Sequence, residues 1–255
     1  MLDVRVLTIF PKMLDSFLRY GNPARAMAHG VLRVTSVDLR DFTNDRHRTT
    51  DDYPYGGGKG MILKPEPVAK AIKALRAQMV SPRVILMTPQ GQVFTQALAQ
   101  ELAGLEGLVL VCSRYEGYDE RILAFVDSEI SVGDYVLSGG ETAAMVIIDA
   151  VARCIPGVLD EQAHAEGESF YHGLLEYPQY TRPRVFEGME VPAILLEGHH
   201  ERIRRWRLKQ ALMRTMQRRP DLLVGRSFSP EEAKLLDQIR AETLSIDREI
   251  TYDVA

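Results

Sequence analysis

The sequence has little of several features that would have pointed to other classes of protein. It has two cysteines in 255 residues, and two isolated cysteines make neither a disulfide framework nor a zinc site. It has no apolar run of the roughly 18 residues that a membrane span requires, because Asp149 interrupts the longest candidate. Asp3 and Arg5 place charge too early for the apolar stretch of a signal peptide. These absences predict a soluble cytoplasmic protein that does not enter a membrane.

Positive charge is also in deficit, since the formal net charge is −4. Its distribution is uneven, however, because residues 201–219 hold eight basic residues and one acidic residue. On a helical wheel four arginines form one stripe and apolar residues take much of the opposite side: Arg204, Arg207, Arg214 and Arg218 against Trp206, Leu208, Leu212, Met213 and Met216. This pattern predicts an amphipathic helix that presents guanidinium groups to an anionic partner. A solvated face or an acidic partner are the alternatives, and RNA is favoured because each neutralised phosphate adds affinity.

The first part of the chain alternates between strand and helix patterns. Residues 83–91 and 107–117 read as buried strands that run into polar turns, and helical patterns follow over about 92–103 and 118–125. Residues 131–141 contain three glycines and read as a short strand that breaks into a Gly-Gly turn before an apolar helical run. This alternation predicts an α/β fold with a mainly parallel sheet, in which ligands bind outside the carboxyl ends of the strands. We expect the three loops to share one pocket, although an ordinary tight turn could also explain the Gly139-Gly140 pair.

The chain changes character between residues 160 and 175. Residues 159–169 are acidic, small and poor in large apolar side chains, which is typical of a linker that orders on binding. Helical patterns with polar connections dominate beyond it. We therefore predict a first domain over 1–160, a flexible linker over 161–175 and a small helical domain over 176–255.

The glycine-rich loop at residues 52–60 is not a nucleotide-binding P-loop. Tyr53 stands where that motif requires its first glycine, and Gly60 stands where it requires serine or threonine. A nucleotide hydrolase that used this loop is therefore disfavoured.

Several motifs in a fixed order resemble one known family. The segments TPQG, RYEGYDER, SVGDYVLSGGE, PQYTRP and RRWRLKQ are similar to those of the bacterial tRNA (guanine-N1)-methyltransferases of the TrmD kind, within the SPOUT superfamily. The resemblance covers nearly the whole chain. It implies a SPOUT-type sheet with a C-terminal trefoil knot, a helical tRNA-binding domain, a homodimer, S-adenosyl-L-methionine as methyl donor and a dependence on Mg²⁺ whose ligands no motif reveals. The reaction it implies is methylation of N1 of the guanine immediately 3′ of the anticodon, position 37.

The acceptor chemistry requires a base and a charge-stabilising partner. Guanine N1 carries a proton at neutral pH, so a base must remove it while a donor stabilises charge that moves onto O6. The resemblance implies Glu168 as the base, where the family has aspartate, and Arg153 as the partner. Glu166 is the rival base. Arg153 could instead serve the negative end of its helix.

The resemblance also implies a cofactor pocket built from the three loops and one later acidic residue. Ser113 stands where the family often has glycine, and Ala143 where it often has proline. The implied cofactor-binding residues are Leu86, Met87, Thr88, Pro89, Ser113, Tyr115, Glu116, Val132, Gly133, Tyr135, Leu137, Gly139, Gly140 and Glu176.

Two alternative functions remain open at the level of the sequence. A non-catalytic RNA-binding protein with the same fold would be compatible with both the basic helix and the departure at Glu168. A SPOUT enzyme that methylates ribose oxygen is disfavoured, because the match extends through the C-terminal part of the chain.

Overall fold

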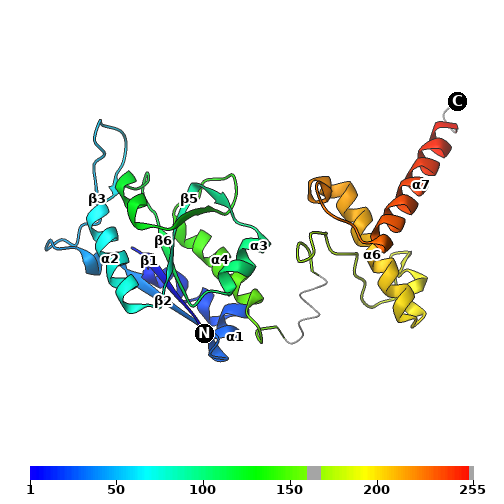
Figure 1. Ribbon diagram of the computed structural model, residues 1–255, viewed down its shortest axis with the longest axis horizontal. Coiled ribbons are helices and arrows are strands. Elements are labelled where there is room, and N and C mark those ends of the chain that lie inside the picture. Colours follow the sequence, from blue (N-terminus) through cyan, green and yellow to red (C-terminus); the bar gives the residue numbers. More distant parts are fainter. Residues whose placement is uncertain (160–167, 253–255) are drawn as a thin grey trace. The chain divides into compact units, whose positions relative to one another are not determined.

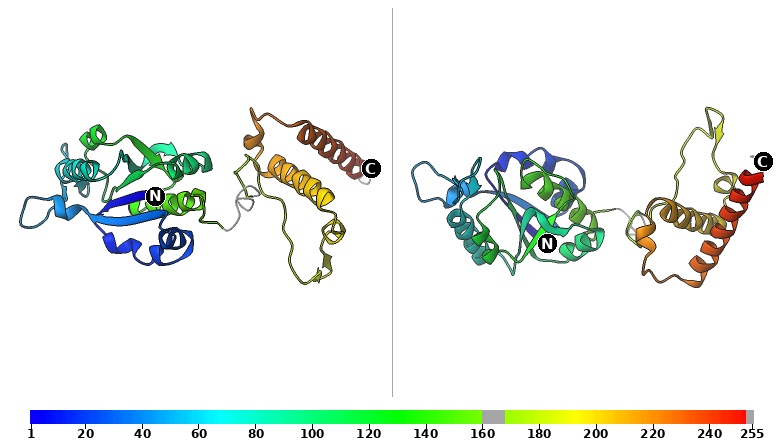
Figure 2. Two further views of the ribbon diagram at one scale, coloured as in Figure 1. Left: turned by 60° about the horizontal axis from the view of Figure 1, so that its bottom comes forward. Right: turned by 90° about the horizontal axis from the view of Figure 1, so that it is seen from above.

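The computed structural model of the protein describes residues 1–159 and 168–252, with side chains to residue 242. The chain divides into two compact units, Met1–Gln162 (unit 1) and Ala163–Ala255 (unit 2). Figures 1 and 2 show the elements within each unit.

Unit 1 is built on a five-stranded sheet in the order β2-β1-β6-β5-β7, in which every described pairing is parallel. A fully parallel sheet is normally covered on both faces, and its strands are correspondingly apolar. All six residues of the central strand β6 are buried. The strands are β1 (Leu2–Thr8), β2 (Leu32–Asp38), β5 (Arg83–Val93), β6 (Gly107–Cys112) and β7 (Ser128–Ser131).

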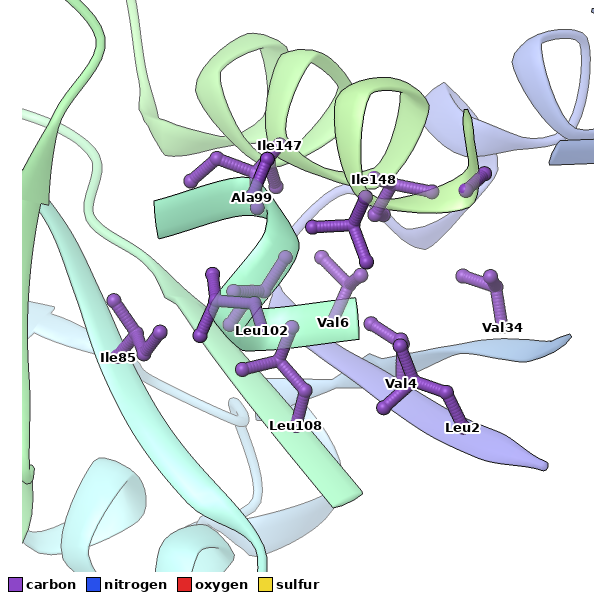
Figure 3. Close-up of a cluster of buried hydrophobic side chains, with 14 of the residues drawn as sticks. Leu2, Val4, Val6, Val34, Ile85, Ala99, Leu102, Leu108, Ile147 and Ile148 are labelled. Atoms are coloured by element: carbon purple, nitrogen blue, oxygen red, sulfur yellow. The ribbon is translucent and has the colours of Figure 1, made fainter. Parts of the chain in front are cut away.

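One face of the sheet is covered by α1 (Gly21–Ala28), α3 (Gln96–Ala103) and α4 (Gly140–Cys154). Side chains alternate between the faces of a strand, so Val4 and Val6 of β1 point to this side together with Leu108 of β6. Figure 3 shows these side chains packed against Ile148 of α4. This layer is the larger apolar core of unit 1.

The other face is covered by α2 (Pro65–Gln78) and by the 3₁₀ segments η3 (Leu39–Phe42) and η4 (Glu120–Phe125). The side chains that alternate with the first set, such as Val109 and Val111 of β6, fill this second core. The described part of unit 1 is therefore a three-layer α/β structure, as the alternating pattern predicts. The glycine-rich loop joins β3 (Asp51–Asp52) to β4 (Ile62–Leu63), which pair in an antiparallel manner.

Unit 2 packs α6 (His200–Arg218) against α7 (Pro230–Tyr252). Between the linker and α6 lie a two-stranded hairpin, β8 (Val185–Phe186) with β9 (Met189–Glu190), and η5 (Ala193–Leu196). The 3₁₀ segment η6 (Pro220–Leu223) follows α6. A small apolar core joins the two helices through Leu212 and Leu235, both about 1% exposed or less.

Three element predictions need correction. The expected helix over about 92–103 begins only at Gln96, because β5 continues to Val93 and breaks register with β7 between Met87 and Gln92. The expected helix over 118–125 is a 3₁₀ segment. The strand expected within residues 131–141 precedes that motif and ends at Ser131, so most of the motif is loop.

The remaining segments of unit 1 lie between the elements already given and complete its N-terminal part. They are η1 (Pro11–Leu14) and η2 (Phe17–Arg19), both short 3₁₀ turns between β1 and α1.

Candidate active site

A cavity of about 280 Å³ lies where β6 and β7 end and where β5 breaks register between Met87 and Gln92. Its walls come from the irregular part of β5 and from the loops that follow β6 and β7, because the carboxyl ends of parallel strands meet at one edge of the sheet. The prediction of one shared pocket is therefore confirmed for the described part of unit 1. The lining residues are Met87, Thr88, Pro89, Gln90, Ser113, Arg114, Tyr115, Glu116, Gly117, Tyr118, Ile130, Ser131, Val132, Gly133, Tyr135, Val136, Leu137, Ser138, Gly139, Gly140 and Ala143.

Glycine is required where the cavity wall meets the sheet. A Cβ on Gly140 would lie 2.7 Å from the Cα of Cys112, which is backbone and cannot turn aside. Its amide N–H donates to the Ser113 carbonyl at 2.9 Å. A Cβ on Gly139 would overlap the guanidinium of Arg114. The glycine pair thus lets α4 begin directly against the end of β6.

A third glycine shapes the loop after β7. Gly133 has φ +143°, a backbone conformation that L side chains rarely adopt. A Cβ there would meet the ring of Tyr135, whose hydroxyl donates to the Val132 carbonyl at 3.0 Å. The loop after β7 is consequently held in a tight local arrangement beside the cavity.

Twelve of the fourteen predicted cofactor-binding residues line this cavity. Leu86 does not, because it is fully buried in the second core on the face of β5 opposite to Met87. Any role of Leu86 in binding is thereby limited to its backbone. The twelve are Met87, Thr88, Pro89, Ser113, Tyr115, Glu116, Val132, Gly133, Tyr135, Leu137, Gly139 and Gly140.

Ser113, one of the two departures from the family pattern, turns its hydroxyl into the wall. Its Oγ donates to the Met87 carbonyl at 2.9 Å and so links the ends of β6 and β5. The second departure, Ala143, also lines the cavity and is buried. Both residues are accommodated by a pocket formed largely by backbone.

Arg114 and Tyr118 line the cavity although neither was a predicted site residue. The Tyr118 hydroxyl donates to Glu129 Oε1 at 3.1 Å, and burial raises the pKa of that hydroxyl. Burial likewise raises the pKa of Tyr115, which has φ +64°. Arg114 lies within the predicted segment 107–117 and Tyr118 follows it directly, and that proximity was the available signal for including them.

Arg114 pairs with a carboxylate that is removed from solvent. Its Nε lies 2.8 Å from Oε2 of Glu141, whose side chain is 0% exposed. Thr8 donates to the other oxygen of Glu141 at 2.6 Å. Burial, followed by the nearby charge of Glu141, raises the pKa of the Cys112 thiol well above its usual value. An ion pair with a buried carboxylate therefore lies at the wall of the cavity, and composition and spacing did not reveal it.

Glu168 and Glu176 belong to unit 2 and line a different cavity. That cavity, of about 930 Å³, lies beside the N-terminal half of α6 and includes Arg204, Arg207 and Arg226 in its lining. Glu168 is half-buried there, and its carbonyl accepts from Tyr171 N–H at 3.4 Å. The amide of Glu176 donates to Ser169 Oγ at 3.0 Å. The structure thus brings the two carboxylates to one cavity of unit 2. Arg153, the predicted partner of Glu168, and the other predicted cofactor-binding residues belong to unit 1.

Arg153 lies in the last turn of α4 in unit 1 and is half-buried. A cation in that position also interacts favourably with the helix terminus. The rival base Glu166 lies outside the described residues, so the choice between Glu168 and Glu166 stays a prediction.

The basic helix exists as α6, and three arginines of its predicted stripe also contact groups of unit 2. Arg204 pairs with Glu201 and Glu231 at 2.8 and 2.6 Å, and Arg207 stacks 4.9 Å from the centre of the Tyr177 ring. Arg214 donates to the Glu176 carbonyl at 3.0 Å. Arg204, Arg207 and Arg218 of the predicted stripe are exposed, as is Arg205, whereas Arg214 is half-buried. Presentation of these guanidinium groups to an anionic partner stays a prediction.

Among the described side chains, residues 1–159 and 168–242, no three from histidine, cysteine, aspartate or glutamate are grouped so that they could hold a metal ion. The helices of this same part of the chain include none with the length and apolar character needed to cross a membrane.

Comparison with known proteins identifies what the chain is similar to. The family model described as tRNA (Guanine-1)-methyltransferase TrmD matches residues 2–225. A tRNA (guanine-N(1)-)-methyltransferase of Dictyoglomus turgidum is 51% identical over 95% of this chain and 98% of its own length. Proteins of the same name from Moorella thermoacetica and Alcanivorax borkumensis are each 54% identical, over 92% and 94% of this chain and 96% and 93% of their own lengths.

Proposed function

The chain belongs to the TrmD family of tRNA (guanine-1)-methyltransferases, and from that membership we propose how its residues carry out the reaction. The enzyme methylates N1 of guanine in tRNA. We assign its target as the guanine immediately 3′ of the anticodon, position 37, and its methyl donor as S-adenosyl-L-methionine. The observation that carries this proposal is the cavity at the strand ends, whose lining residues all lie within the part of the chain that the family model matches.

The cavity suits a flat nucleoside with a polar tail. Its volume of about 280 Å³ lies near the roughly 300 Å³ at which small-molecule sites begin. The glycine cradle at 139–140 admits close approach by backbone groups, while Leu137 and Val132 supply apolar contact. Tyr115 and Glu116 line the same cavity and would hold the amino-acid end. When bound, S-adenosyl-L-methionine supplies a methyl group already activated by its sulfonium.

The acceptor is prepared by residues of the chain itself. We assign Glu168 as the base that removes the N1 proton of guanine, and Arg153 as the donor that stabilises charge on O6. Support for Glu168 comes from its half-buried place in the unit 2 cavity, where Arg204 and Arg207 lie in the same lining. Glu176 is assigned to the amino group of the cofactor.

We further propose a homodimer in which the unit 2 residues of one protomer complete the pocket of its partner. The exposed apolar side chains next to the unit 1 cavity support this assembly, above all Val136, which is 90% exposed. The trefoil knot is proposed from family membership and from the loops that meet where β5, β6 and β7 end. Because its substrate is tRNA, we place the enzyme in the cytoplasm. The described residues offer no donor set for Mg²⁺, and no step is assigned to that ion.

Methyl transfer to two tRNA transcripts tests the proposal. The transcripts differ only in guanine or adenine at position 37, and the donor is labelled S-adenosyl-L-methionine. We expect incorporation into the guanine transcript alone. Binding of tRNA without incorporation into either transcript would contradict the proposal and favour a non-catalytic RNA-binding protein.

A further inference from the structure

Glu141 is a fully buried carboxylate that the proposed chemistry does not use. It lies in the first turn of α4, where the N-terminal end of a helix favours negative charge. A buried carboxylate is destabilising unless its oxygens are paired and hydrogen-bonded. Both oxygens of Glu141 have a partner, and the two partners come from the ends of different strands of the sheet.

The first partner is the hydroxyl of Thr8 at the end of β1. Its Oγ donates to Glu141 Oε1 at 2.6 Å and accepts from the Phe10 amide at 2.9 Å. Thr8 is itself 0% exposed. The hydroxyl therefore orients the carboxylate while it remains shielded from water.

The second partner is the guanidinium of Arg114, which lines the cavity while Glu141 does not. Arg114 Nε lies 2.8 Å from Glu141 Oε2, and its Nη1 donates to the Ser138 carbonyl at 3.0 Å. Its guanidinium carbon lies 4.7 Å from the centre of the Phe10 ring. The same guanidinium fills the space that a side chain at Gly139 would need. The carboxylate of Glu141, the ring of Phe10 and the carbonyl of Ser138 thus hold Arg114 in place together.

We propose that Glu141 is a positioning residue for cofactor binding, which acts by holding Arg114 against the cavity wall at residues 138–140. The inference rests on the proposed function, because the ligand of this cavity is taken to be S-adenosyl-L-methionine. Glu141 reaches the ligand only through Arg114. Thr8, Glu141 and Arg114 form a chain of contacts that connects β1, α4 and the loop after β6 behind one wall of the pocket.

The substitution Glu141→Gln tests the inference in the full-length protein. It preserves size but replaces one acceptor with an NH₂ group and removes the charge that faces Arg114. Hydrogen bonds to charged groups stabilise more than neutral ones do, and the loss of one here should loosen Arg114. The Kd for S-adenosyl-L-methionine, measured by calorimetry, should therefore rise by roughly 10- to 100-fold. At saturating cofactor we expect kcat to change by less than about threefold, because the base and its partner are untouched. Glu101→Gln is the matched control. Glu101 is an exposed carboxylate of α3 that pairs with Arg83 of β5, and its substitution should leave both values unchanged.

A double-mutant cycle distinguishes positioning from a general effect on folding. In an Arg114→Met background, Glu141→Gln should change the cofactor Kd by less than about twofold, since the residue through which it acts is gone. We also expect the double variant to unfold at a higher temperature than Arg114→Met alone, which leaves Glu141 buried without its charge partner. Equal weakening by Glu141→Gln in both backgrounds would overturn the inference.

Thr8→Val provides a second route if Glu141→Gln does not fold. It keeps the shape of Thr8 but removes its hydroxyl, and we expect a rise in Kd of roughly 3- to 10-fold that disappears in the Arg114→Met background. A folded Glu141→Gln or Thr8→Val protein with the cofactor affinity of wild type would refute the inference. A wild-type protein that binds no S-adenosyl-L-methionine would instead refute the proposed function.

Discussion

The cavities of the two units are lined by different kinds of residue. The cavity of unit 1 is walled by turns and glycines, and a buried charge pair lies behind the wall. The cavity of unit 2 has many charged side chains in its lining. Some of them lie on α6, such as Arg204, and others on the segment before it, such as Glu168. Backbone walls hold a shape that a single side-chain change rarely abolishes, whereas a reactive carboxylate depends on one residue. We infer that unit 1 supplies recognition and unit 2 supplies the reactive group.

The largest expected effect follows from removal of the base in unit 2. Glu168→Gln should lower kcat for methyl transfer by roughly 10²- to 10⁴-fold, the range over which general bases contribute. Its cofactor Kd should stay as in wild type, because the unit 1 cavity is unchanged. Single-turnover transfer from labelled S-adenosyl-L-methionine and calorimetry measure the two quantities.

Glu190→Gln is the matched control, since Glu190 is an exposed carboxylate in β9 of the same unit. It should retain the wild-type kcat. Full activity of Glu168→Gln would transfer the role of base to Glu166 and would leave the enzyme assignment standing.

A core truncation in each unit tests whether the two cores are energetically separate. Leu110→Ala in β6 and Leu212→Ala in α6 each delete a side chain that is 0% exposed, and each should lower the free energy of unfolding of its own unit by about 2–5 kcal/mol. Chemical denaturation followed by the fluorescence of Trp206, in unit 2, should shift with Leu212→Ala.

Cofactor affinity provides the complementary readout for these two variants. Folded Leu212→Ala protein should bind S-adenosyl-L-methionine nearly as tightly as wild type, because thirteen of the fourteen proposed cofactor residues belong to unit 1. Strongly weakened cofactor binding by this variant would show that the cofactor site depends mainly on the core of unit 2. Leu196→Ala, at a side chain 49% exposed, is the control for a change outside the core.

A smaller effect is expected from crowding the glycine cradle. Gly140→Ala places a methyl group against the backbone of Cys112, and overpacking of this kind costs about 1–3 kcal/mol of stability. Because α4 must then shift away from β6, cofactor affinity should fall as well, as measured by calorimetry. Gly104→Ala, at a position with negative φ and no atom closer than 3.4 Å, should leave both unchanged. Equal cofactor affinities for the two variants would show that Gly139 and Gly140 do not shape the wall of the unit 1 cavity.

The smallest expected effect is a change in how tRNA affinity depends on salt concentration when two exposed arginines of α6 are replaced. Arg205→Gln combined with Arg218→Gln should reduce the slope of log affinity for tRNA against log salt concentration by about 0.7–0.9 for each phosphate that these arginines neutralise. Arg240→Gln, at an exposed arginine of α7 that faces Asp237 at 3.7 Å, is the control. Filter binding across a salt series measures the slopes. An unchanged slope in the double variant would remove these arginines from the RNA-binding surface.

The sequence alone predicted the elements with a strong pattern. The apolar run of β6, the basic helix α6 and the three loops after the strands all follow from local periodicity and turn chemistry. Twelve of the fourteen predicted cofactor residues line one cavity because parallel strands end at a common edge. Leu86 does not line it, because alternation along β5 turns its side chain into the second core.

Only the tertiary structure decided which charged residues are engaged with one another. Thr8 and Glu141 are 133 residues apart along the chain, and no local spacing predicts their contact or that of Glu141 with Arg114. Helical periodicity likewise predicted the arginine stripe of α6, but it did not predict that Arg204 pairs with Glu231 or that Arg214 donates to the Glu176 carbonyl. Periodicity reports which face of an element is apolar, because burial acts on each residue locally. The pairing of charges depends on which elements meet, and that is determined by the packing of the whole unit.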